Sequence, residues 1–355
     1  MTEALHVVLP GAIDDPAAPS GGNTYDRRVL TGLAADRDVH EIAVPAPWPH
    51  PRAADSAALA RALAELPDGA VVLLDGLVGC AVPELLEPHR ARVRLVVLVH
   101  LPLGDETGLS GAEAAELTAR ERRTLHAAAA VVATSSGAAR RLETLHDLPA
   151  GSVHVAAPGV DPAPPAAPSP EGGRLLCVAA VTPRKAQDVL VTALRSVADL
   201  PWTCTLVGAL DRAPAFTDRV RELVAAADGA RDRIHLAGTR TGPALERSYA
   251  EADLLVLPSL AETYGMVVTE ALARGVPVLG TRVDGVPEAL GSAGDGTTPG
   301  ELVPPGDPEA LAAALRRWLT DPRLRRSWRA SARHRRDGLR GWDETTRRLS
   351  EVLYA

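Results

Sequence analysis

The feature that most constrains this chain is an alternation of short apolar runs with longer amphipathic stretches, which occurs in two series. Continuous apolar strands that alternate with helices are typical of a parallel sheet covered on both faces. We expect strands over residues 5–9, 39–44, 70–74, 93–99, 130–134 and 153–157 in the first series, and over 174–180, 203–207, 234–237, 254–257 and 276–279 in the second. Helices are expected at 55–66, 111–128, 135–145, 322–336 and 342–354.

Two helix starts are marked by their capping residues. Ser110 and Glu113 form a capping-box pattern, in which each side chain bonds the backbone of the other residue. Asp307 followed by Pro308 predicts an N-cap with proline at the first helical position.

A stretch rich in proline and glycine separates the two series. Residues 162–173 read PAPPAAPSPEGG, which disfavours regular structure and indicates a linker. We expect an α/β fold of two doubly wound, Rossmann-like lobes that face a cleft. The lobes span residues 1–165 and 174–336, with a linker over 166–173 and a last helix within 337–355. Ligands of such lobes bind at the carboxyl ends of the strands, and the cleft is therefore the expected site.

Composition excludes several classes of protein. A net charge of −7 argues against a general nucleic-acid binder, which needs a basic surface. No apolar run reaches the roughly 18 residues of a membrane-spanning helix, and the N-terminus begins on a strand-like run rather than a secretion signal. The cysteines lack paired spacing, so we expect no disulfide framework, no metal site and a cytoplasmic location; they are Cys80, Cys177 and Cys204.

Some residue types are rare in this chain, which uses arginine almost everywhere as its cation. There is one lysine (Lys185), one asparagine (Asn23) and one internal methionine (Met266). Rare types in such a chain are expected where their chemistry is needed.

The first segment of interest, residues 19–28 (PSGGNTYDRR), follows the first strand. Gly21 and Gly22 allow a close approach of backbone to a ligand, and the helix that follows offers free N–H groups to an anion. The pattern is not G-x-G-x-x-G, so a dinucleotide fingerprint is absent. An ordinary strand-to-helix turn is the alternative, against which the presence of Asn23 and Tyr25 counts.

Two further segments place charged or titratable groups at strand ends. His100 ends the fourth strand, where a histidine satisfied by backbone groups is the alternative. Arg184 and Lys185 follow the first strand of the second series and precede a helix. Two cations and a helix N-terminus together suit a diphosphate; a solvated basic pair is the alternative, and the use of the only lysine counts against it.

Residues 258–277 (PSLAETYGMVVTEALARGVP) carry a pair of glutamates. Glu262 lies in a strand-to-helix loop and Glu270 on the helix, about two turns on. Gly265 and Met266 present backbone N–H groups at the helix start. One site could thus hold hydroxyl groups by carboxylate and phosphate by backbone, whereas a capped amphipathic helix does not explain Glu262.

These segments together resemble the family-4 retaining glycosyltransferases of the GT-B fold, over most of the chain. The glutamate pair with EALARGVPV matches the family's E-x7-E signature. His100, the Pro-x-Lys turn before Lys185, the glycine pair and residues 158–161 (PGVD) match further motifs. The resemblance also implies that the last helix crosses back onto the first lobe.

The resemblance implies roles for individual residues. Lys185 would contact the departing diphosphate, Glu262 hydroxyls of the transferred sugar, and Glu270 the donor ribose. Backbone groups of residues 265–267, Val267 included, would contact sugar and phosphate, and His100 would lie beside the anomeric carbon. Gly21 and Gly22 would close over the diphosphate, and backbone near 239–241 would contact the nucleobase.

Two positions depart from the family pattern. The family often has Gly-Arg five residues before its lysine, where this chain has Ala179 and Ala180; Arg184 is a candidate replacement for that cation. The family's Gly-Gly in the next loop is Asp284-Gly285 here, which would change contacts around the donor.

The implied function is metal-independent, retaining transfer of a sugar from a nucleoside-diphosphate sugar to an acceptor hydroxyl. No cofactor is expected, and a UDP- or GDP-sugar is the expected co-substrate. The alternatives are a sugar-nucleotide epimerase or hydrolase on the same fold, and a two-lobed sugar-binding protein without chemistry. For the acceptor, the candidates are Asn23, Tyr25 and Arg27, with Arg28 and the loop 101–110. The arginine-rich tail, residues 323–348, is expected to be a solvated helical face, with peripheral contact to an anionic membrane as the alternative.

Overall fold

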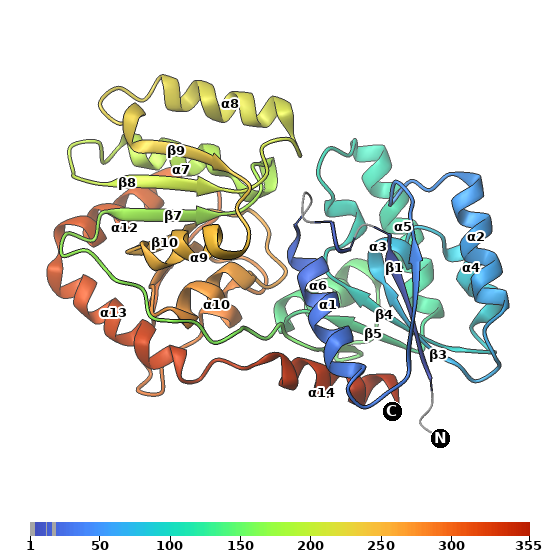
Figure 1. Cartoon of the computed structure of the whole chain (residues 1–355). Coiled ribbons are helices and arrows are strands. Elements are labelled where there is room, and N and C mark those ends of the chain that lie inside the picture. The colour runs from blue at the N-terminus through green and yellow to red at the C-terminus, as the bar shows by residue number, and fades with distance from the viewer. Residues whose placement is uncertain (1–3, 12, 16–18) are drawn as a thin grey trace. The chain divides into compact units, whose positions relative to one another are not determined.

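The computed structural model describes residues 4–11, 13–15 and 19–355, which form two compact units (Figure 1). Unit 1 comprises the described residues up to Gly159 together with Trp342–Ala355, and unit 2 comprises Val160–Gly341. Each unit is built on its own six-stranded parallel sheet with helices on both faces. The fold is the two-lobed, doubly wound α/β architecture that the alternating pattern predicts.

The sheet of unit 1 has the strand order β2-β1-β3-β4-β5-β6. Its strands are β1 (Leu5–Pro10), β2 (Val39–Val44), β3 (Val71–Asp75), β4 (Arg94–Val99), β5 (Ala130–Ala133) and β6 (Val153–Val155). Its helices are α1 (Gly21–Leu33), α2 (Ala53–Ala64), α3 (Gly76–Gly79), α4 (Pro83–Leu86), α5 (Gly111–Ala127), α6 (Ser136–His146) and α14 (Trp342–Leu353).

The sheet of unit 2 has the order β12-β11-β10-β7-β8-β9. Its strands are β7 (Arg174–Val178), β8 (Thr203–Val207), β9 (Ile234–Gly238), β10 (Leu254–Leu257), β11 (Val278–Thr281) and β12 (Gly300–Val303). Its helices are α7 (Gln187–Arg195), α8 (Pro214–Ala225), α9 (Gly242–Ala250), α10 (Met266–Ala273), α11 (Val286–Leu290), α12 (Pro308–Thr320) and α13 (Pro322–Arg336).

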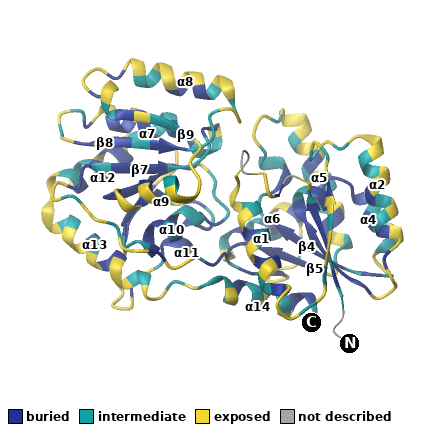
Figure 2. Cartoon of the chain, in the orientation of Figure 1, coloured by how far each residue is buried: buried dark blue, intermediate teal, exposed yellow. Residues whose placement is uncertain are grey.

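The predicted strands are confirmed to within two residues at each end. The central strands are buried in their sheets (Figure 2), and a strand that is covered on both faces is apolar throughout, which makes it recognisable in the sequence. The capping box at Ser110 and the Asp307 cap are also present as predicted. Strand β12 was not predicted: its sequence, GELV, is short and only its two ends are buried. It joins the sheet through its register with β11.

Helix α14 belongs to unit 1, although nearly two hundred residues of unit 2 precede it in the chain. Leu349 and Leu353 are fully buried in the core that β1 and α1 share. The Arg94 guanidinium of β4 donates to the carbonyl oxygens of Val352 and Leu353, both at 3.0 Å, and so caps the end of α14.

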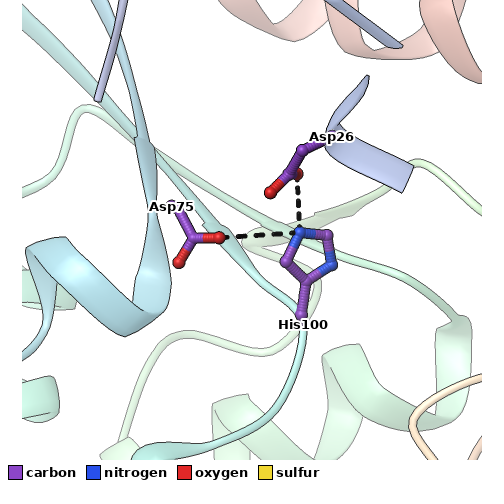
Figure 3. A group of neighbouring side chains, drawn as sticks. All are labelled: Asp26, Asp75 and His100. Carbon is purple, nitrogen blue, oxygen red and sulfur yellow. Dashed lines mark hydrogen bonds and ion pairs between the residues drawn. The ribbon is translucent and has the colours of Figure 1, made fainter. Parts of the chain in front are cut away.

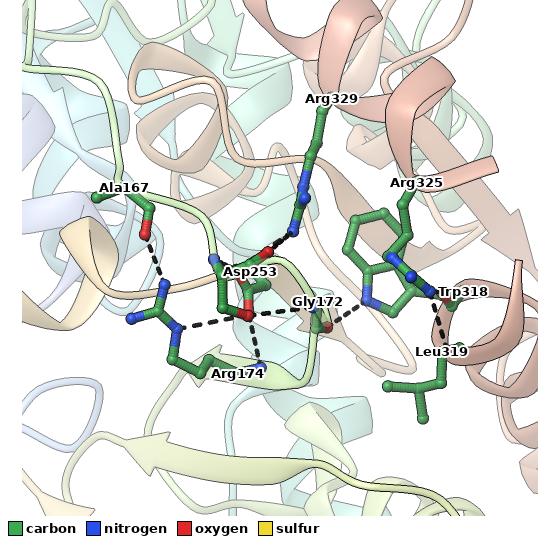
Figure 4. A network of polar contacts seen from close by, with 9 residues as sticks. Ala167, Gly172, Arg174, Asp253, Trp318, Leu319, Arg325 and Arg329 are labelled. Carbon is green, nitrogen blue, oxygen red and sulfur yellow. Dashed lines mark hydrogen bonds and ion pairs between the residues drawn. The ribbon is translucent and has the colours of Figure 1, made fainter. Parts of the chain in front are cut away.

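The proline-rich segment predicted as a linker is irregular, but it is bonded to unit 2. The Asp253 carboxylate, fully buried just before β10, accepts from the Ser169 hydroxyl at 2.6 Å and from the Arg174 backbone N–H at 2.9 Å (Figure 4). Arg329 of α13 approaches the same carboxylate at 3.3 Å and donates to the Ser169 carbonyl at 2.9 Å. Residues 160–173 therefore lie in unit 2, and the division between the units falls after Gly159.

The ion pairs of Asp253 are expected to contribute strongly to the free energy of unfolding of unit 2. The substitution Asp253→Asn leaves two guanidinium groups facing a neutral amide, and loss of one partner of a buried ion pair costs about 3–5 kcal/mol. Chemical denaturation should show a loss of that size, whereas Asp228→Asn, on an exposed loop, should change stability little. Equal stability of both variants would show that the network contributes nothing.

Candidate active site

In unit 2, the loops that carry Lys185 and Glu262 follow two adjacent strands, at the point where the strand order reverses. Strands β7 and β10 are neighbours, although the chain runs from β7 to β8 and β9 on one side and from β10 to β11 and β12 on the other. Loops at the carboxyl ends of two such strands diverge and leave a crevice that binds ligands. Lys185 follows β7 and Glu262 follows β10.

A tight turn positions Lys185. Residues Pro183–Lys185 form a 3-10 turn, closed by the Lys185 N–H, which donates to the Thr182 carbonyl at 3.0 Å. The following residue, Ala186, is buried and has a left-handed backbone with φ of 53°, so helix α7 starts in a new direction. The side chain of Lys185 is thereby held beside the loop after β10.

Lys185 and Glu262 form an ion pair, and both side chains are largely buried. The Ser259 hydroxyl donates to the same Glu262 oxygen at 3.1 Å, and the Glu262 N–H donates to Asp284 at 3.2 Å. Burial alone would raise the pKa of Glu262, but the charges of Lys185 and Arg184 outweigh it and lower that pKa. Burial lowers the pKa of Lys185, which Glu262 partly offsets.

Arg184 adds a second cation next to this pair. One of its terminal N–H groups donates to the Ala261 carbonyl at 3.2 Å. Its Nε atom is buried, with no hydrogen-bond acceptor among the described residues. Its charge also contributes to the lowered pKa values of Glu262 and Lys185.

The start of helix α10 lies beside the same carboxylate. Gly265 precedes the helix with a left-handed φ of 93°, and a Cβ atom there would lie 3.3 Å from Cγ of Glu262. No side chain in the described part of the chain caps this helix, so the amides of its first residues, Met266 and Val267, are available to an anion. The Lys185 ammonium group, the Arg184 guanidinium group and the N-terminus of α10 therefore all lie next to Glu262 and its loop.

Glu270, about one turn into helix α10, has a different partner. Its carboxylate accepts a hydrogen bond of 2.6 Å from the hydroxyl of Tyr249, whose ring is covered by Arg274. Burial raises the pKa of Glu270, although Tyr249 and Arg274 oppose the shift. Glu270 and Glu262 therefore lie on the same helix-loop segment but in separate polar surroundings.

In unit 1 the strand order reverses between β1 and β3, and His100 lies just after the neighbouring strand β4. Its Nε2 atom lies 2.7 Å from the Asp26 carboxylate of α1 and 4.0 Å from Asp75 at the end of β3 (Figure 3). Gly22 makes this possible, since a Cβ atom there would lie 3.3 Å from the His100 ring. The glycine brings the first turn of α1 against the imidazole.

The Asp26 carboxylate is the main group that holds a proton on His100. Burial would lower the pKa of His100, but the charges of Asp26 and Asp75 prevail and raise it to about 9. Burial and the Asp26 charge raise the pKa of Asp75 to about 8. The three groups offer ligand atoms within 4.8 Å of one another. A metal ion there would have to displace the proton, because a metal binds the neutral imidazole.

The structure places the expected acceptor-binding residues in different surroundings. Tyr25 is buried, and its hydroxyl donates to the Ala156 carbonyl at 2.9 Å, so the expectation that it faces an acceptor is not supported. Arg27 is paired with Asp14 and Glu41, both at 2.7 Å. Asn23 is partly exposed in the first turn of α1, where its N–H donates to the Ser20 cap. Gly21 and Gly22 are the first two residues of helix α1.

Sequence reasoning missed Asp26, Asp75, Ser259 and Tyr249. Asp75 directly follows the apolar run VVLL, so its place at a strand end was a usable signal. Tyr249 is one of only four tyrosines, and rarity pointed to it as it did to Lys185. Asp26 sits in a run of charged residues, and only the contact with His100 distinguishes it.

Two family models of glycosyltransferases match this chain. Residues 6–164 match the model of Glycosyltransferase Family 4, and residues 172–321 match that of Glycosyl transferases group 1. A D-inositol 3-phosphate glycosyltransferase of Kineococcus radiotolerans is 32% identical over 255 residues, which cover 65% of this chain and 58% of that protein. The chain thus spans less than two thirds of this curated relative's length.

Solved structures share the fold. A sucrose-phosphate synthase from Thermosynechococcus elongatus superposes with a TM-score of 0.79 at 23% identity, covering 99% of this chain and 98% of that one. HepE from Anabaena, solved in complex with UDP-glucose, gives 0.74 at 18% identity and covers 99% of both chains. The two units therefore have the GT-B fold.

The proton on His100 is measurable by NMR titration of its ring resonances. The protonated ring should persist at pH 7.5 and titrate near pH 9. Since this pKa is raised on folding, its contribution to stability is complete below pH about 6.5 and is lost as the pH rises through about 9. Asp26→Asn should lower the pKa of His100 by at least about one unit, because an adjacent carboxylate typically shifts a pKa by one to three units.

The exposed His235, in the same spectrum, serves as the control, and its ring resonances should coincide in the two proteins. A His100 resonance that titrates near pH 6.5 in the wild-type protein would contradict the charged pair.

Proposed function

We propose, from its matches to the models of Glycosyltransferase Family 4 and Glycosyl transferases group 1, that this chain transfers a sugar from a nucleoside-diphosphate sugar to an acceptor hydroxyl. The observation that carries the proposal is the buried Lys185–Glu262 ion pair at the point where the strand order of unit 2 reverses. It joins a cation suited to phosphate with a carboxylate suited to hydroxyl groups.

The diphosphate would bind where the positive groups gather. When the bond between the sugar and the phosphate breaks, negative charge develops on the leaving diphosphate, and fixed donors lower the barrier by stabilising that charge. Lys185, Arg184 and the first amides of α10 are such donors. Arg184, whose Nε has no acceptor among the described residues, would take the place of the arginine that the family often has where this chain has Ala180. This set of donors would act without a metal ion.

Donor binding would exchange partners within the ion pair. In the free protein Glu262 neutralises Lys185, so neither charge is buried alone. An arriving diphosphate can replace Glu262 as the counter-ion of Lys185. The released carboxylate could then accept hydrogen bonds from hydroxyls of the sugar.

Glu270 and Tyr249 would serve the nucleoside. The Glu270 carboxylate uses one oxygen for the Tyr249 hydroxyl. Its remaining acceptor positions suit two neighbouring hydroxyls, such as those of a ribose. Residues 239–241, which follow β9 at the same edge of the sheet, are the proposed contact for the base.

We propose that configuration at the anomeric carbon is retained through displacement on one face of the sugar. The acceptor oxygen would bond to the anomeric carbon as the phosphate oxygen leaves, and the acceptor proton would pass to the departing phosphate. The His100–Asp26 pair in unit 1 would supply a charged hydrogen-bond donor to a substrate oxygen, through the ring nitrogen that Asp26 does not contact.

The proposed donor is a UDP- or GDP-sugar, and no further cofactor is required. The solved complex of HepE with UDP-glucose supports a uridine nucleotide on this fold. A cytoplasmic location is proposed because all three cysteines are buried free thiols, as expected in a reducing compartment. Among the described residues, no helix is both long and apolar enough to span a lipid bilayer.

Replacing Lys185 by alanine should lower turnover by about 100-fold or more, because removal of one fixed donor typically costs that much. The assay measures release of nucleoside diphosphate from a panel of nucleotide sugars, with and without acceptors. Lys185→Arg keeps the charge and should retain more activity than Lys185→Ala. Turnover of Lys185→Ala close to that of the wild type would contradict the assignment.

The same assay separates the alternatives. Transfer requires the acceptor and yields a glycosylated product. A hydrolase would release free sugar without acceptor, and an epimerase would change the sugar without releasing nucleotide.

A further inference from the structure

A cavity lies in unit 2 at the opposite edge of the sheet from the candidate active site. It occupies about 450 Å³ and adjoins the residues that lead into β10 and β11, namely Asp253 and Pro277. In a parallel sheet these are the amino ends of the strands, whereas Lys185 and Glu262 follow the carboxyl ends. A ligand in this cavity would therefore occupy a site separate from the proposed donor site.

Positive charge predominates in the cavity wall. Four guanidinium groups and two carboxylates line it, although the chain as a whole carries a net charge of −7. One of those carboxylates, Asp253, is already neutralised by Arg174 and Arg329 (Figure 4). The guanidinium groups belong to Arg274, Arg329, Arg333 and Arg336.

Arg333 is the cation of this wall whose charge is available to a ligand. Its side chain is exposed and has no hydrogen bond or ion pair with any residue that the structure describes. Its stem lies against Gly275, where a Cβ atom would come within 3.2 Å of Cγ of Arg333. The contact holds the stem at the cavity wall and leaves the guanidinium group available.

Arg329 indicates that the wall carries more positive charge than its carboxylates balance. Its Nε atom is buried, with no acceptor in the described part of the chain. Burial lowers the pKa of Arg329, and the charges of Arg325, Arg333 and Arg174 lower it further, against the single opposing effect of Asp253. An anion in the cavity would relieve this crowding.

Both chain segments that connect unit 2 to unit 1 contribute to the wall. Pro165, Ala166 and Pro168 come from the segment that enters unit 2, and Arg336 and Asp337 come from the segment that leaves it. The two segments are already bonded to each other, because Arg336 donates to the Ala163 carbonyl at 2.7 Å. A ligand here would contact both of them.

We propose that this cavity binds a phosphate-bearing small molecule, with Arg333 as its principal contact. The guanidinium fork matches phosphate oxygens in pairs. The volume lies within the range of small-molecule sites, and the prolines and alanines of the wall suit a compact organic group attached to the phosphate. The site would act as an effector site on the connecting segments, and it does not depend on the proposed transfer reaction.

The test is calorimetric titration with inorganic pyrophosphate and with a hexose monophosphate, on the wild-type chain and on Arg333→Ala. The monophosphate should bind the wild type and bind Arg333→Ala at least about tenfold more weakly. Arg326→Ala removes the same charge from an exposed position of α13 outside the cavity wall, and it should bind as the wild type does. Lys185→Ala should also retain this binding, which separates the cavity from the proposed donor site.

Hydrogen–deuterium exchange then locates the ligand. The monophosphate should protect residues 163–168 and 274–277 in the wild type, and not in Arg333→Ala. Equal affinity of Arg333→Ala and Arg326→Ala, or protection confined to residues 182–187 and 259–270, would overturn the proposal. Unchanged melting temperature of Arg333→Ala without ligand confirms that lost binding is not lost folding.

Discussion

The pairing of Lys185 with Glu262 is the interaction on which the account of this protein depends. Two opposite charges are buried together at the edge of a sheet, and neither could be buried alone without a large cost in free energy. Arg184 and Ser259 complete the arrangement, so the free protein holds a preorganised, neutralised form of its proposed diphosphate site. Exchange of Glu262 for a phosphate group would keep the Lys185 ammonium group compensated.

The same principle operates in unit 1. There His100 is the buried cation, and Asp26 is its counter-ion. In each unit the parallel topology brings these groups together, because neighbouring strands end at one edge and the reversal of strand order opens a crevice there. Glycines permit the close approaches that follow: Gly22 beside the His100 ring and Gly265 beside Glu262.

Much of the fold could be predicted from the sequence, because strands buried on both faces must be apolar throughout. The exception, β12, is a four-residue edge strand that depends on its pairing with β11. The site was predictable where a residue type was rare, as with Lys185, or matched a family motif, as with Glu262. The roles of Asp26 and Tyr25 were not predictable from the sequence, because they depend on contacts in three dimensions. Asp26 contacts His100, and the Tyr25 hydroxyl donates to the Ala156 carbonyl.

The most direct test of the proposed exchange uses the fact that Lys185 is the only lysine. Lysine labelled with ¹⁵N on its side chain gives a single Nζ resonance, which reports on this ammonium group alone. The account predicts that a nucleotide sugar shifts this resonance on binding, and that Glu262→Gln shifts it in the free protein. Binding of the nucleotide sugar, established by calorimetry, with an unchanged Nζ resonance would contradict the account.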